Sequence, residues 1–190
     1  TKKNEFNTNF LISTPLKIKY EISENKNNYG FLNNNLNLKK VSRYKFSKIN
    51  NFDYLDPTLV FYKDDLIFFD NKGYILRFND NSKIIWKKNY YNKVEKKSSP
   101  ILNFSIKDKI LLVTDSLSKY YALNLETGDI IWSKNHNTVF VSEIKIDNDK
   151  FYAIDANNNI NCFSLKDGSK IWEFKSEFEL IKSQKKLSIV

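Results

Sequence analysis

The stretch DSLSKYYALNLETGDIIW, residues 115–132, decides the fold, because the chain contains the same pattern twice more. The other copies are DNKGYILRFNDNSKIIW at 70–86 and DANNNINCFSLKDGSKIW at 155–172. Each copy ends in one of the three tryptophans of the chain: Trp86, Trp132 and Trp172. These tryptophans are 46 and 40 residues apart (132−86 and 172−132). A repeat of about 40 residues built from short strands is typical of a β-propeller, in which each repeat forms one blade.

Each repeat divides into four short stretches rich in Ile, Val, Tyr and Phe, separated by Asp, Asn, Gly and Ser, as in strands joined by tight turns. In the second repeat the expected strands are 99–106, 109–115, 119–125 and 129–134. Connections this short make neighbouring strands antiparallel. We therefore expect an all-β chain that forms a partial, open β-propeller, with about three full blades of four antiparallel strands plus edge strands.

The repeat register also predicts the organisation of the chain. Residues 1–56 are the least repeat-like and are expected to be an N-terminal lead that supplies an edge or closing strand. Residues 57–190 are expected to be the propeller blades, with bounds at about 57–94, 98–136, 138–176 and, for the start of a further blade, 178–190. Because the sequence stops inside that last pattern, we interpret the chain as a piece of a longer propeller.

Three kinds of residue recur at fixed places in the repeats, and we interpret them as structural. The tryptophan is large enough to bridge to the neighbouring blade. Gly128 and Gly168, four residues before their tryptophans, allow a positive φ and the close approach of a ring. Ser82 replaces this glycine in the first repeat, which predicts a less regular turn there. The recurring aspartates, expected to bond the amides of the next turn, are Asp70, Asp115 and Asp155.

The segment ALNLETGDIIW, residues 122–132, resembles the repeat of quinoprotein-like (PQQ-like) propellers, whose pattern is A-x-D-x-x-x-T-G-K-x-x-W. The matching residues are Ala122, Thr127, Gly128 and Trp132, while Asn124 and Asp129 replace the Asp and the Lys of the pattern. The third repeat keeps Gly168 and Trp172. Within this family, the polar lead followed by a strand and then the first blade resembles the branch of BamB-like outer-membrane assembly lipoproteins.

This resemblance implies a non-enzymatic scaffold that binds other proteins, namely the outer-membrane assembly machinery of the periplasm, and that needs no cofactor. Two alternatives stay open: a fragment of a PQQ-dependent dehydrogenase, and a propeller that binds a polyanion or a carbohydrate. The dehydrogenases of this fold are expected to have a calcium ion, a catalytic aspartate and, in many members, a vicinal cysteine pair. Here Cys162 is the single cysteine, and it is expected to be a small buried thiol. We expect no catalytic, cofactor-binding or metal-binding residue.

The charge of the chain is strongly positive, with a formal net charge of +9. Its two arginines are Arg43 and Arg77, and arginine is the usual reader of phosphates and bases, so a nucleic-acid partner is not expected. The lysines are scattered along the sequence and are interpreted as a solvated surface. No run of about 20 apolar residues is present, so the sequence predicts no membrane-spanning helix.

Polar loops supply the remaining candidates. Residues 147–149, Asp-Asn-Asp, fall at a predicted turn, and turn chemistry explains them without a metal. His136 is the only histidine and is expected in a surface loop. The candidate contact segments are the link 89–97 between the first two repeats and the loop 135–137 after the second.

Overall fold

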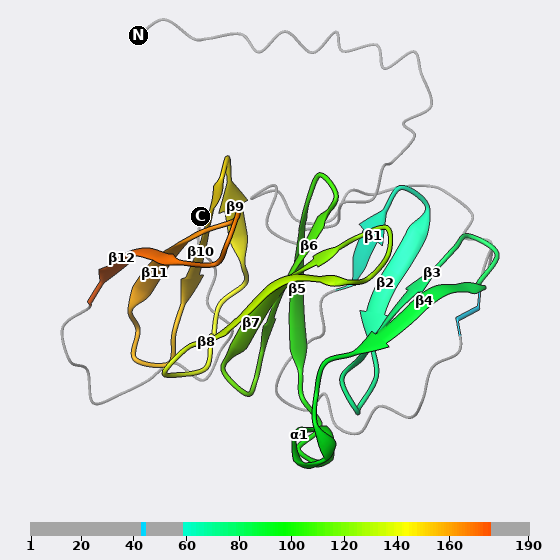
Figure 1. Ribbon diagram of the computed structural model, residues 1–190, viewed down its shortest axis with the longest axis horizontal. Helices are drawn as coiled ribbons and strands as arrows, with labels where there is room; N and C mark the ends of the chain where they lie inside the picture. The colour runs from blue at the N-terminus through cyan, green and yellow to red at the C-terminus, as the bar shows by residue number, and fades with distance from the viewer. Residues whose placement is uncertain (1–42, 45–58, 176–190) are drawn as a thin grey trace, which may run out of the picture.

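The computed structural model describes residues 43–44 and 59–175, and within them the chain forms three four-stranded sheets and one short helix. Figure 1 shows the sheets side by side like the blades of a fan, with the second repeat in the middle. Each sheet holds four consecutive strands in sequence order, and every neighbouring pair is antiparallel. The expectation of an all-β chain forming part of a propeller is therefore confirmed.

The sheets are called blades 1, 2 and 3 below. Blade 1 consists of β1 (Val60–Tyr62), β2 (Asp65–Phe69), β3 (Tyr74–Phe78) and β4 (Ile84–Asn89). Blade 2 consists of β5 (Leu102–Lys107), β6 (Ile110–Asp115), β7 (Lys119–Asn124) and β8 (Ile130–Asn135). Blade 3 consists of β9 (Lys145–Asp147), β10 (Lys150–Ile154), β11 (Ile160–Ser164) and β12 (Lys170–Phe174).

The first strands of blades 2 and 3 begin at Leu102 and Lys145, later than the starts at residues 99 and 142 that the sequence predicts, because side chains replace part of the backbone ladder. Ile101 donates its backbone N–H to Ser116 Oγ at 3.0 Å. In blade 3, Ser142 Oγ accepts the backbone N–H of Ile154 at 2.8 Å. These hydroxyls satisfy amides that a longer strand would otherwise have paired.

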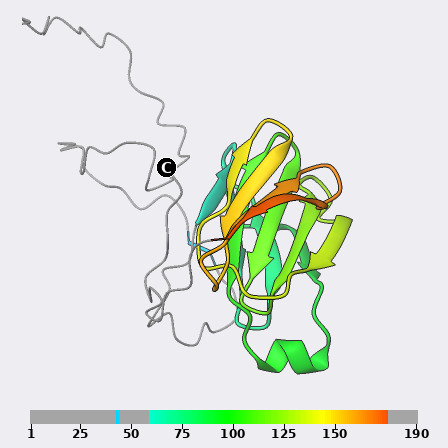
Figure 2. The ribbon, with the colours of Figure 1, turned by 90° about the vertical axis from the view of Figure 1, so that its left-hand side faces the viewer.

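The link between blades 1 and 2 contains the helix α1 (Lys93–Lys97), which the sequence analysis did not predict. Its start is fixed by a capping box, in which Asn92 Oδ1 accepts the backbone N–H of Glu95 and the Glu95 carboxylate accepts the backbone N–H of Asn92. Figure 2 shows α1 at the end of the blades where the chain passes from one sheet to the next.

The three tryptophans occupy the same register position in their sheets. Each lies on the fourth strand opposite a residue of the third strand: Arg77 faces Trp86, Ala122 faces Trp132 and Cys162 faces Trp172. In every blade the register shifts at the next residue of the third strand, which is the mark of a β-bulge. The sequence repeat is thus also a repeat of backbone geometry.

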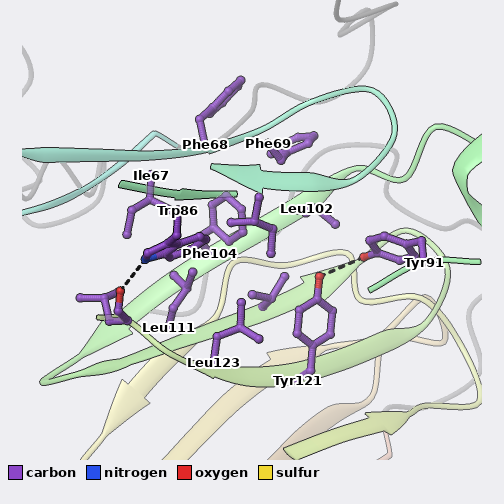
Figure 3. Close-up of a cluster of buried hydrophobic side chains, with 13 residues drawn as sticks. Ile67, Phe68, Phe69, Trp86, Tyr91, Leu102, Phe104, Leu111, Tyr121 and Leu123 are labelled. Carbon is purple, nitrogen blue, oxygen red and sulfur yellow. Dashed lines mark hydrogen bonds between the residues drawn. The ribbon is translucent and has the colours of Figure 1, made fainter. Parts of the chain in front are cut away.

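The hydrophobic core consists of the layers between the blades. One buried cluster joins blades 1 and 2 and includes Ile67, Trp86, Leu111 and Leu123 (Figure 3). A second cluster joins blades 2 and 3 and includes Leu112, Phe151 and Phe163. A third, smaller cluster consists of Leu66, Leu76 and Phe78 of blade 1. Because the faces between neighbouring blades cover one another, a single repeat could not bury its own core.

Two of the sequence-based domain assignments lie mostly or wholly outside the described residues: the lead 1–56 and the further blade 178–190. Of the lead, Arg43 and Tyr44 are described, and the Tyr44 ring packs edge-on against Phe78 with centroids 5.4 Å apart. Among the described residues, no helix has the length and apolarity that crossing a membrane requires.

Candidate functional site

The repeated tryptophan of one blade binds to a turn of the next blade. Trp86 Nε1 donates to the carbonyl oxygen of Leu125 at 3.0 Å, and Trp132 Nε1 donates to that of Leu165 at 3.0 Å. The ring lies on the glycine of the same turn. A Cβ atom added to Gly128 would lie 2.9 Å from Trp86 Cδ2, and one added to Gly168 would lie 2.6 Å from Trp132 Cζ3. Each glycine therefore makes room for the tryptophan of the preceding blade.

The turns that receive the rings also need a left-handed residue. Gly128 has φ 75° and Gly168 has φ 69°, a region that L-residues other than glycine rarely adopt. Ser82 in blade 1 has φ 60°. Its turn is closed by backbone hydrogen bonds from Asn79 N to Lys83 O and from Ser82 N to Asn79 O, both 2.9 Å. This turn differs from the other two: it is one residue shorter, and a serine rather than a glycine has the positive φ.

The three recurring aspartates cap the turns between the second and third strands. In each case Oδ1 accepts the backbone amides two and four residues later. The amide donors are Lys72 and Tyr74 for Asp70, Leu117 and Lys119 for Asp115, and Asn157 and Asn159 for Asp155, at 2.8–3.0 Å. The residue between the two amides has a positive φ each time: Gly73, Ser118 and Asn158.

The second carboxylate oxygen of two of these aspartates reaches the link that leaves the preceding blade. The Tyr91 hydroxyl donates to Asp115 Oδ2 at 2.6 Å, and Tyr121 Oη lies 3.1 Å from Tyr91 Oη (Figure 3). In the next interface His136 Nε2 lies 3.2 Å from Asp155 Oδ2. Tyr91 and His136 both follow the fourth strand of their blade, so each aspartate joins its own turn to the link that enters its blade.

His136 is not the surface residue that the sequence predicted. Its side chain is only 6 % exposed, and its ring stacks on Phe140 with centroids 4.8 Å apart. Asp155 belongs to blade 3 and lies 19 residues after His136, so the sequence around His136 could not reveal this partner. The structure places His136 in the interface between blades 2 and 3.

The protonation states of these buried groups follow from their surroundings. Burial raises the pKa of the Asp115 carboxyl group. Burial, followed by the proximity of Tyr121 and Asp115, raises the pKa of the Tyr91 hydroxyl, which therefore stays protonated and able to donate. Burial would also raise the pKa of Asp155, but the donors on Asn159, His136, Asn161 and Asn157 together lower it.

A buried arginine that the sequence analysis did not single out strengthens the first interface. Arg77 donates through Nε to Asp65 Oδ2 at 2.7 Å and through a terminal nitrogen to the carbonyl oxygen of Leu125 at 2.9 Å. The same nitrogen lies 3.3 Å from the Glu126 carboxylate. The signal in the sequence was the position itself, because the corresponding residues of the other repeats are Ala122 and Cys162.

The described residues contain no group of three or more His, Cys, Asp or Glu side chains that could hold a metal ion. Asn148 has φ 50° at the turn between β9 and β10, and its side-chain nitrogen lies 3.2 Å from both Asp147 carboxylate oxygens. Cys162 is buried, and burial raises the pKa of its thiol. The polar groups named above are all engaged within or between blades.

A comparison with family models identifies the family. A family model described as "Outer membrane protein assembly factor BamB" matches residues 71–186, which is more than half of the chain. The chain belongs to this family of PQQ-like propeller repeats. The comparison with curated proteins gave no match.

Solved structures share the fold at low sequence identity. BamB from Moraxella catarrhalis is similar with a TM-score of 0.54 at 18% identity, over 66% of this chain and 36% of that chain. The computationally designed protein Ika4 has a TM-score of 0.54 at 12% identity, over 71% of this chain and 80% of that chain. A europium-containing methanol dehydrogenase has a TM-score of 0.52 at 11% identity, over 62% and 24%. The chain thus spans about a third of that BamB, and these similarities show the fold alone.

Proposed function

We propose that this chain is part of a non-enzymatic propeller scaffold that binds other proteins during assembly of outer-membrane β-barrel proteins. The observation that carries this proposal is the family match over residues 71–186, whose description names that assembly process. A periplasmic location at the outer membrane is part of the same proposal.

The hydrogen bonds of the recurring aspartates support a structural role for these residues. In both Asp115 and Asp155, one carboxylate oxygen accepts amides of its own turn, and the other contacts a side chain in the link from the preceding blade. A general acid or base needs an atom free to meet a substrate. Carboxylates held in this way instead hold the blades in a fixed arrangement, which suits a surface for binding proteins.

The alternatives from the same fold make different predictions. A dehydrogenase fragment would belong to a protein that reduces a dye once it is loaded with pyrroloquinoline quinone and calcium. A carbohydrate- or polyanion-binding propeller would bind such polymers through the lysines with strong salt dependence. The methanol dehydrogenase similarity favours neither, because a fold hosts many functions.

The experiment that tests the proposal is deletion of the gene that encodes this chain, followed by quantification of β-barrel proteins in the outer membrane. We expect their amounts to fall while inner-membrane proteins stay unchanged, and expression of the full-length protein in trans to restore them. Unchanged β-barrel levels, together with quinone-dependent dye reduction by the purified full-length protein, would replace the scaffold with the enzyme.

A further inference from the structure

The helix α1 contains three lysines, and the fold brings a fourth, Lys87 of β4, close to one of them. Lys87 Nζ on β4 lies 4.3 Å from the centroid of the Tyr74 ring, and Lys96 Nζ on α1 lies 5.4 Å from the same centroid. Lys93 and Lys97 are exposed on the same helix, three residues before and one residue after Lys96. Lys87 and Lys96 therefore meet at one tyrosine beside the outer strand of blade 1. Together with Lys93 and Lys97 of the same helix, we call these four lysines the α1 patch.

The α1 patch has no acidic partner within the part of the chain that the structure describes. The one acidic residue of the helix, Glu95, is engaged elsewhere: it accepts from the Asn92 backbone and pairs with Lys119 Nζ of blade 2 at 2.6 Å. Hydrogen bonding from Lys119 accordingly lowers the pKa of Glu95. The same contact fixes the helix to blade 2, so the lysines are presented from a held element.

The helix that carries three of these lysines also exposes an apolar side chain. Val94 has 74% of its surface exposed, the largest exposure among the large hydrophobic residues of the described chain, and it lies between Lys93 and the paired Glu95. Phosphate backbones of nucleic acids have no use for an apolar contact of this kind, and the buried Arg77 is unavailable as a reader of bases. A polypeptide segment that carries both carboxylates and an apolar side chain matches both features.

We propose that the α1 patch binds an acidic segment of a partner polypeptide, with carboxylates on the lysines and an apolar side chain on Val94. The inference rests on the proposed function, because it identifies the chemistry of a protein partner. Positive groups held together without carboxylates raise the local potential, which attracts and orients an acidic partner. The affinity falls as salt is added, because the groups are exposed.

A labelled peptide tests the inference on the full chain. The probe is a fluorescein-labelled decapeptide of glutamates with one central leucine, and binding is measured by fluorescence anisotropy at low and at 0.5 M salt. We expect the variant Lys87→Gln/Lys96→Gln to bind about five to tenfold more weakly, since each exposed charge pair contributes a factor of a few. The matched control is Lys107→Gln/Lys109→Gln, which removes the same charge from the turn before β6 and should bind like the parent.

A second variant isolates the apolar contact. Val94→Ser should weaken the leucine-containing peptide but leave an all-glutamate peptide unchanged. Equal loss in the patch variant and its control, or no binding by the parent, would overturn the inference. Binding to phosphatidylglycerol vesicles or to a single-stranded oligonucleotide in preference to the peptide would also overturn it. Failure of these tests leaves the β-barrel measurements above untouched, so the two proposals fail separately.

Discussion

The contact between Trp132 and Gly168 gives the sharpest prediction about stability. In Gly168→Ala the new methyl group meets the indole ring at 2.6 Å and the residue must keep φ 69°. The left-handed conformation costs an L-residue roughly 1–2 kcal/mol. The overpacked ring adds about 1–3 kcal/mol. We therefore expect Gly168→Ala to lower the free energy of unfolding by about 2–5 kcal/mol.

A double-mutant cycle separates these two costs. In a Trp132→Ala background the ring is gone, so Gly168→Ala should cost only the conformational part, about 1–2 kcal/mol. The assay is urea unfolding of the full chain followed by far-UV circular dichroism, because removal of a tryptophan changes the fluorescence. Ser82→Gly is the control: a serine already has φ 60° in the shorter turn of blade 1, so glycine relieves the backbone there and removes only the exposed 3.3 Å hydrogen bond from Arg43 N to Ser82 Oγ. This variant should not destabilise.

The result that would refute the reasoning is an equal cost of Gly168→Ala in both backgrounds. Equal costs would mean that the methyl group and the ring do not meet, and that glycine is needed only for its backbone conformation. A destabilising Ser82→Gly would instead show that the left-handed turn is not the strained element.

Three further predictions concern the groups between blades. Tyr91→Phe should cost about 1–3 kcal/mol in urea unfolding, because Asp115 loses a donor in a buried site; an unchanged midpoint would show that the hydrogen bond contributes nothing net. The pKa of Asp115 in the folded state is raised above 3.8. Its contribution to the free energy of unfolding is therefore present in acid and is lost as pH rises through that raised pKa. Relative to the parent, Asp115→Asn should become less destabilising from pH 4 to pH 7. The pKa of Asp155 is lowered below 3.8, so its contribution to the free energy of unfolding is present above pH 3.8 and is lost as pH falls through the lowered pKa. Asp155→Asn should therefore destabilise most at pH 7 and least in strong acid. If the effects of both variants on the free energy of unfolding changed with pH in the same direction, the assignment would be contradicted.

The repeat architecture could be predicted because it depends on residues that are close together in the sequence. Short alternating strands, the turn glycines and the spacing of the tryptophans are properties of adjacent residues, and they repeat in the structure as equivalent register positions. The same holds for the aspartates, whose turn amides lie two and four residues away.

Contacts between repeats were harder to predict because they join residues far apart in the sequence. The partner of His136 is Asp155 in the next blade, and the neighbourhood of the histidine in the sequence, NHN, is typical of an exposed loop. Arg77 was interpreted through composition alone, although its position in the repeat, otherwise occupied by Ala122 or Cys162, lies in the middle of the sheet. Lys87 and Lys96 of the α1 patch come from a strand and a helix, and only the fold brings these two to one ring.

The central claim is that Trp86 and Trp132 each anchor the following blade, and exchange of the indole N–H protons measures this directly. The three tryptophans give three indole signals in a ¹H–¹⁵N NMR spectrum of the full chain, each assigned by a Trp→Phe variant. Trp86 and Trp132 donate to Leu125 and Leu165, whereas Trp172 is 44% exposed. The account predicts that in D₂O the Trp172 signal vanishes first, while those of Trp86 and Trp132 persist. Loss of all three signals at the same rate would contradict it.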